Sequence, residues 1–234
     1  MSTPAVPEPL RQQLALALDV DDDVVALRLA RELQPWFGVA KVGLELYSAF
    51  GPDIVGALSD MGYLVFADLK FHDIPTTVGR AARVVGSLGA RYLNFHAQGG
   101  VPMLQAGVEG FLAGAESAGL PEPVPLAVTI LTSEPDASPE VLTARVQAAV
   151  TGGCAGVVCG TGDVATVKAQ APDLLAVVPG IRPPGAETHD QARSGTPEEA
   201  LAAGADLLVI GRAVTQSDQP AAAAAALVEP LLVG

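Results

Sequence analysis

The chain has 234 residues, 50% of them apolar, and a formal net charge of −13. This length and composition can build one sizeable core, so we expect a single domain over residues 1–234. Such an acidic chain argues against a protein that binds nucleic acid or an anionic membrane surface, since both tasks require an excess of Lys and Arg.

The N-terminal residues 1–10 lack a charged-then-apolar signal pattern, and no apolar run reaches about 18 residues. We therefore expect a cytoplasmic protein. Cys154 and Cys159 have neither the spacing nor the histidine partners of a metal site, which predicts two core residues in a reducing compartment. With three histidines in the chain and no second carboxylate cluster, we expect no metal.

Eight short apolar runs alternate with helical segments along the chain, which is typical of a parallel sheet with right-handed crossovers. The predicted strands are Leu14–Leu18, Val39–Gly43, 64–70, Arg91–His96, Pro125–Leu131, Gly156–Cys159, Leu175–Val178 and Asp206–Ile210. The predicted helices include Val24–Leu33, Pro52–Met61, Thr76–Ser87, Val101–Ala118, Pro139–Val150 and the alanine run Ala221–Ala226.

A closed (β/α)₈ TIM barrel accounts for this length and this number of strands. The alternative is an open doubly wound sheet, but no strand–Gly-x-Gly-x-x-Gly–helix unit stands near the start of the chain. The two longest insertions, 132–139 and 182–197, follow the fifth and seventh strands. Loops of that length usually carry function.

Three charged residues, Asp68, Lys70 and Asp73, stand where the apolar third strand ends. Strand alternation puts Asp68 and Lys70 on one face, whereas Asp73 lies beyond the strand and its own chain need not aim it at Lys70. A solvated surface cluster is the alternative, but the strand is too apolar to be solvated on either side. Two nearby carboxylates favour the protonated ammonium, so Lys70 is expected to donate a proton rather than form a Schiff base.

Polar residues gather at the carboxyl ends of the predicted strands, which form the catalytic face of a barrel. They are Asp19, Lys41, Asp68, Lys70, His96, Thr132, Arg182 and Arg212. Four of the thirteen basic residues therefore converge on one rim, which predicts an anionic substrate. Gly211-Arg212 after strand eight and Arg182 after strand seven occupy the loops that often bind phosphate in barrels. An ordinary turn with a solvated Arg is the alternative.

The sequence resembles the orotidine 5′-phosphate decarboxylase family, in its short single-function bacterial form, over nearly its whole length. The motifs that carry the resemblance are Leu16–Asp19, Lys41–Gly43, Asp68–Pro75, Val128–Ser133, Pro179–Arg182, Asp190-Gln191 and Ile210–Arg212. The resemblance implies a (β/α)₈ barrel that works as a homodimer without cofactor or metal. The chain departs from the family pattern at Thr76, usually Asn, and at His189, often acidic.

The resemblance also implies a role for each matching residue in the decarboxylation of orotidine 5′-monophosphate. Lys70 is the proton donor with Asp68 beside it, and Asp73 and Thr77 reach into the other subunit's site. The remaining residues contact the ribose (Asp19, Lys41), the pyrimidine (Thr132) and the phosphate (Arg182, Gln191, Gly211, Arg212).

Two other functions remain open at this point. One is a magnesium-dependent sugar-phosphate decarboxylase or aldolase of the same barrel superfamily, which carries a Glu where this chain has Lys41. An ammonium at that position repels a divalent cation. The other is a non-catalytic nucleotide-phosphate binding barrel, against which the presence of all three charged residues of the third strand argues.

Overall fold

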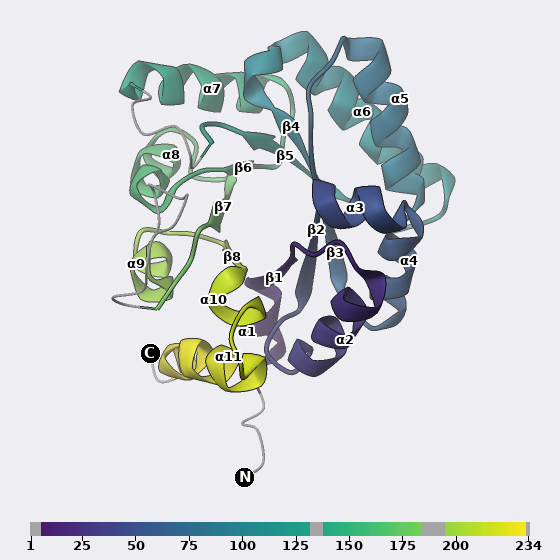
Figure 1. Ribbon diagram of the computed structural model, residues 1–234. Helices are drawn as coiled ribbons and strands as arrows, with labels where there is room; N and C mark the ends of the chain where they lie inside the picture. The colour runs from purple at the N-terminus through teal and green to yellow at the C-terminus, as the bar shows by residue number, and fades with distance from the viewer. Residues whose placement is uncertain (1–5, 132–137, 184–194, 233–234) are drawn as a thin grey trace.

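The computed structural model describes residues 6–131, 138–183 and 195–232. Eight parallel strands close into a barrel in chain order, and the last strand pairs with the first through Leu14–Leu208, Ala15–Val209 and Leu16–Ile210. Helices surround the strands in Figure 1. The predicted (β/α)₈ barrel is therefore confirmed.

The strands are β1 Leu14–Leu18, β2 Val39–Gly43, β3 Leu64–Phe71, β4 Tyr92–His96, β5 Val124–Val128, β6 Gly156–Val158, β7 Leu175–Pro179 and β8 Leu207–Ile210. The α-helices are α1 Glu8–Gln12, α2 Asp23–Leu33, α3 Leu44–Phe50, α4 Asp53–Asp60, α5 Pro75–Ser87, α6 Val101–Ser117, α7 Pro139–Thr151, α8 Val164–Gln170, α9 Pro197–Ala202, α10 Arg212–Thr215 and α11 Pro220–Val228. The predicted end of the fifth strand at Leu131 is wrong, because β5 stops at Val128 and Thr129 bonds to Val158 O through its backbone N–H and its hydroxyl.

The strands are buried on both faces, as parallel barrel strands are. In β1, Leu14, Leu16 and Leu18 pack outward against the helices, while Ala15 and Ala17 belong to a separate apolar cluster inside the barrel. This alternation follows from the twofold period of a strand. It leaves the barrel interior filled by side chains up to the level where the charged residues begin.

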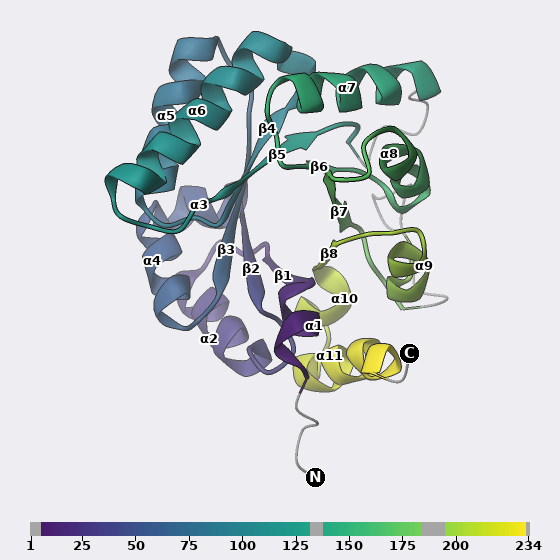
Figure 2. The ribbon, with the colours of Figure 1, turned by 180° about the vertical axis from the view of Figure 1, so that it is seen from behind.

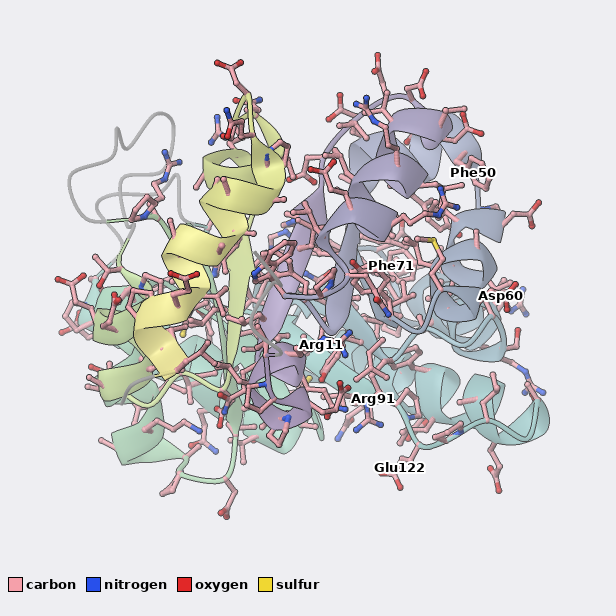
Figure 3. All side chains as sticks on the ribbon, turned by 90° about the horizontal axis from the view of Figure 1, so that it is seen from below. Arg11, Phe50, Asp60, Phe71, Arg91 and Glu122 are labelled. Atoms are coloured by element: carbon pink, nitrogen blue, oxygen red, sulfur yellow. The ribbon has the colours of Figure 1, made fainter. Side chains whose placement is uncertain are left out.

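Arginines close the amino-terminal end of the barrel. The Arg11 guanidinium donates to Phe37 O at 3.4 Å, and that of Arg91 donates to Glu122 O. Figure 2 shows this end of the barrel with α1 in front, and Figure 3 labels Arg11, Arg91 and Glu122 in the lower half of the molecule. These cations therefore lie apart from the basic residues at the carboxyl ends of the strands.

Helices α5 and α6 lie side by side in Figures 1 and 2 and approach each other through glycine. A Cβ atom at Gly110 would overlap the carbonyl of Gly79, and one at Gly114 would overlap that of Arg83. Both obstacles are backbone atoms that cannot rotate away. The spacing of this helix pair therefore requires the absence of a side chain at these positions.

Cys154 and Cys159 are both buried, as predicted for core residues. Burial raises the pKa of the Cys154 thiol to about 12, so this thiol is inert at neutral pH. Within the described ranges, no helix combines the length and the apolar character needed to cross a membrane.

Candidate active site

A pocket of about 490 Å³ opens at the carboxyl ends of the strands. Its lining includes Asp19, Lys41, Asp68 and Lys70 from the first three βα units and Arg182, Gly211 and Arg212 from the last two. Every predicted site residue of these units that the structure describes therefore faces one cavity, apart from Asp73 and Thr77. Glu45 and Gln216 also line the pocket and were not predicted.

Two lysines and two aspartates alternate along one wall of the pocket. Lys41 Nζ lies 2.9 Å from Asp19 Oδ1 and 3.2 Å from Asp68 Oδ2, and Lys70 Nζ lies 2.5 Å from Asp68 Oδ1. The sequence pointed to Lys70 as the lysine held between two carboxylates. In the described chain Lys41 occupies that place, and Lys70 ends the row.

The charges in this row stabilise one another. Burial alone would raise the pKa of Asp68, but Lys41, Lys70 and a hydrogen bond from Asn94 lower it to about 2. Burial alone would lower the pKa of Lys41, and the carboxylates of Asp68 and Asp19 reverse this, so its pKa is raised. Both groups are therefore ionised at neutral pH.

Gly43, the last residue of β2, lets Asp19 and Lys41 meet. A Cβ atom on Gly43 would lie 2.7 Å from Asp19 Oδ1 and 3.2 Å from Lys41 Nζ. These distances are shorter than van der Waals contact, so a side chain here would push the ion pair apart.

The strand that carries Asp68 and Lys70 is irregular at that point. Ala67 pairs with Leu93 and Phe71 with Phe95, so the register shifts between Ala67 and Phe71. Lys70 has φ 49°, a left-handed conformation that costs a residue with a side chain about 1–3 kcal/mol. Such bulges occur next to active sites, where they change the direction of a side chain.

Asn94 in β4 bonds to both ends of the Asp68–Lys70 segment. Its Oδ1 accepts the Lys70 backbone N–H at 2.7 Å, and its Nδ2 donates to Asp68 Oδ1 at 2.7 Å. The side chain is fully buried. Sequence reasoning missed this residue, although an amide between Leu93 and Phe95 in an apolar strand was the available signal.

The opposite rim of the pocket carries two arginines. Arg182 follows β7 and is buried, and its backbone N–H donates to Gly195 O at 3.0 Å. Arg212 begins α10 directly after Gly211, whose missing Cβ leaves room beside Ala17 of β1. This arrangement agrees with the prediction that both arginines face one site.

Asp73 and Thr77 do not line this pocket. Both are exposed, and Asp73 Oδ1 accepts the backbone N–H of Ile74 at 2.6 Å. Thr132 and Gln191, the other two predicted site residues, lie outside the described residues. The rings of His72 and His96 pack 5.4 Å apart beside the charged strand. In the parts of the chain that the structure describes, no group of three or more His, Cys, Asp or Glu residues could hold a metal ion.

Comparison with known proteins agrees with this geometry. The model of the "Orotidine 5′-phosphate decarboxylase / HUMPS family" matches residues 12–227. Orotidine 5′-phosphate decarboxylases of Thermobifida fusca and Anaeromyxobacter sp. are 44% and 43% identical, over 93% and 92% of this chain and 95% and 96% of theirs. The crystal structure of the Lactobacillus acidophilus enzyme superposes with a TM-score of 0.79 at 32% identity, covering 93% of this chain and 98% of that one. The chain belongs to the orotidine 5′-phosphate decarboxylase / HUMPS family.

Proposed function

We propose that this protein decarboxylates orotidine 5′-monophosphate to uridine 5′-monophosphate in pyrimidine biosynthesis. The observation that carries the proposal is the alternating row of Lys70, Asp68, Lys41 and Asp19 in a pocket whose other rim holds Arg182 and Arg212. The row offers an ammonium to a reacting carbon, and the arginines offer a phosphate site. The relatives named orotidine 5′-phosphate decarboxylase support the same reaction.

Lys70 is the proposed catalytic acid. When the bond from C6 to the carboxylate carbon breaks, CO₂ leaves and the electron pair stays on C6, where no adjacent carbonyl delocalises it. The Lys70 ammonium stabilises the developing charge, and then its N–H bond breaks as the C6–H bond forms. Lys70 ends neutral and recovers its proton from solvent.

Asp68 is proposed to lie beside the carboxylate that leaves. With a pKa of about 2 it is anionic at neutral pH, so it repels the substrate carboxylate but not the neutral CO₂ product. Its two lysine partners limit this repulsion. Asp68 also holds the Lys70 ammonium in place through the 2.5 Å ion pair.

The other residues are proposed to bind the parts of the nucleotide that do not react. Asp19 and Lys41 contact the ribose, Thr132 contacts the pyrimidine, and a set of four residues holds the phosphate. The phosphate set is Arg182, Gln191, Gly211 and Arg212. Since the phosphate is remote from C6, its binding energy can be used to orient the base against the charged row.

We also propose a cytoplasmic homodimer in which Asp73 and Thr77 enter the partner's site. Three observations support this: both residues lie outside their own pocket, Ile74 between them is 66% exposed, and Leu44 at the pocket is 57% exposed. Large apolar side chains so exposed at one end of a barrel suit a protein–protein contact. An Asp68–Lys70–Asp73 array would then be assembled from two chains.

The experiment that tests the function follows the ultraviolet absorbance of orotidylate with purified protein, with and without a chelator. We expect turnover in both conditions, and a loss greater than about 10²–10⁴-fold in Lys70→Ala, since charge stabilisation and the proton source disappear together. Turnover of Lys70→Ala within tenfold of wild type would refute the role of Lys70. Loss of activity with chelator would favour the magnesium-dependent alternative, and binding without turnover would favour the binding barrel.

A further inference from the structure

We propose that Asn94 is a positioning residue of this reaction, which aims Asp68 and Lys70 at the substrate through its side-chain amide. This inference rests on the proposed function and adds a residue that does not touch the pocket. The amide forms two hydrogen bonds of 2.7 Å, one to each residue, from the interior of the neighbouring strand β4.

The first hydrogen bond, from the Lys70 backbone N–H to Asn94 Oδ1, stabilises a segment of β3 that lacks regular pairing with β4. Between the pairs Ala67–Leu93 and Phe71–Phe95, β3 has three residues where β4 has Asn94 alone. The bulge moves the Lys70 N–H away from the strand carbonyls, and a buried N–H without an acceptor is costly. Asn94 Oδ1 supplies the acceptor and so stabilises the φ of 49° that turns the Lys70 side chain into the pocket.

The second hydrogen bond fixes the orientation of the Asp68 carboxylate. Oδ1 receives both Lys70 Nζ at 2.5 Å and Asn94 Nδ2 at 2.7 Å, which leaves Oδ2 directed at Lys41 at 3.2 Å. Without the Asn94 amide, the Asp68 carboxylate could rotate to the orientation that its ion pair with Lys41 favours. Asn94 therefore links the backbone of the proton donor to the carboxylate that holds its ammonium.

Only a side chain that accepts and donates at these two positions can replace the amide. Leucine has nearly the same shape and does neither, so Asn94→Leu removes both bonds without a large cavity. Asn94→Asp keeps the acceptor, and its carboxyl gains the donor only when it is protonated. Burial and the charge of Asp68 raise the pKa of such a carboxyl, while Lys70 and Lys41 oppose this, so it is expected to titrate within the pH range of an assay.

Thr129→Val is the matched control. Thr129 follows β5, is buried, and bonds through its hydroxyl to Val158 O at 2.9 Å, so valine also replaces a buried polar side chain by an apolar one of the same shape. It contacts none of the four charged residues in the row through a hydrogen bond or ion pair. General loosening of the barrel would affect this variant as well.

The experiment measures kcat on orotidylate and the Kd for uridine 5′-monophosphate in wild type, Asn94→Leu, Asn94→Asp and Thr129→Val. We expect Asn94→Leu to lose at least tenfold in kcat with a product Kd within threefold of wild type. Thr129→Val should keep kcat within threefold. The ratio of wild-type to Asn94→Asp kcat should fall at least fivefold from pH 8 to pH 5, because protonation restores the lost donor.

Hydrogen exchange in the unliganded protein tests the hydrogen bond between the Lys70 amide and Asn94 without measuring turnover. The Lys70 amide should exchange at least tenfold faster in Asn94→Leu than in wild type, and stay protected in Asn94→Asp. If the wild type is active and Asn94→Leu has the same kcat, the role of Asn94 is overturned while the proposed function stands. The same holds if the ratio of wild-type to Asn94→Asp kcat does not vary with pH. Absence of wild-type turnover would overturn the proposed function, and this role with it.

Discussion

The ammonium of Lys41 lies 3.2 Å from Asp68 Oδ2, across the boundary between β2 and β3. The Lys41 side chain is only 9% exposed, so Asp68 and Asp19 replace the water that would otherwise solvate its charge. Asp68 is the partner that both lysines share, so removing it alone would leave the buried Lys41 with Asp19 only and Lys70 with neither carboxylate. Stability and catalysis are therefore coupled in this pocket.

The coupling predicts an acid-sensitive contribution of Asp68 to stability. Its folded pKa of about 2 lies below the ordinary value of 3.8, so the stabilisation is complete above about pH 5 and is lost as the pH falls through 3.8 toward 2. The full contribution is about 2 kcal/mol, of which roughly half is gone at pH 3. Urea unfolding should show that the free energy of unfolding falls less between pH 6 and pH 3 in Asp68→Asn than in wild type. Equal losses would contradict the low pKa.

The close approach at Gly43 predicts a variant with low activity and a stable fold. In Gly43→Ala the new methyl group displaces Asp19, whose side chain is half exposed and can move. The free energy of unfolding should therefore change by less than about 1 kcal/mol. Turnover of orotidylate should fall at least tenfold. The control is Gly56→Ala inside α4, where nothing lies within 4 Å of the added methyl group and activity should persist. Full activity of Gly43→Ala would mean that the Asp19–Lys41 pair does not matter for turnover.

The phosphate assignment of Arg212 predicts a loss that depends on the substrate. Arg212→Ala should cost the nucleotide roughly 1.5–3 kcal/mol of transition-state stabilisation, calculated from the ratio of wild-type to variant kcat/KM. It should barely change the slow reaction of the phosphate-free nucleoside. Steady-state kinetics on both substrates measures this difference. Arg31→Ala, an exposed arginine of α2, should change neither. Equal losses on both substrates would identify Arg212 as a structural residue.

The proposed shared site predicts complementation between two inactive variants. Lys70→Ala and Asp73→Ala homodimers should both be nearly inactive, yet in a mixed dimer one site carries both defects and the other carries none. Random exchange should therefore restore about a quarter of wild-type activity per subunit, for independent sites in a two-fold dimer. If mass measurement confirms the exchange and no activity returns, Asp73 acts within its own chain.

The glycine contact between α5 and α6 predicts a purely structural defect. Gly110→Ala places a methyl group against the Gly79 carbonyl, which can yield only if the helices separate, so we expect a loss of about 1–3 kcal/mol in unfolding free energy. Thermal or urea unfolding measures it. The same substitution at Gly56 should stabilise the protein by about 0.5–1 kcal/mol, because alanine favours the helix.

Strand positions were predictable from the sequence because both faces of each strand are apolar and turn residues bound them. The bounds of β1 and β2 were predicted to the residue. The fifth strand was extended too far, since Ile130 and Leu131 are apolar but leave the sheet after Thr129 bonds to β6. Short helices such as α3 and α10 were not recognised, because four to seven residues show no amphipathic period.

Site residues were predictable where they stand at the carboxyl end of a predicted strand. Asp19, Lys41, Asp68, Lys70, Arg182 and Arg212 could be placed on one rim because carboxyl ends of parallel strands meet at one end of a barrel. That Lys41 also lies between two carboxylates could not be predicted, since strand order does not give the distances between side chains of neighbouring strands. Asn94 was missed because the bulge in β3 and the left-handed Lys70, to which its amide bonds, depend on contacts between β3 and β4.

The pairing of β1 with β8 gives the protein a fixed order of assembly during synthesis. On the ribosome, β2 and β3 emerge early, so Lys41, Asp68 and Lys70 can come together while most of the chain is still missing. At about 5–20 residues per second, β8 follows on the order of ten seconds later, and only then can Leu208 close against Leu14. Arg212 joins the lining of the same pocket at this last step. A nascent chain that ends before β8 should therefore hold the charged row without Gly211 and Arg212 of the phosphate set.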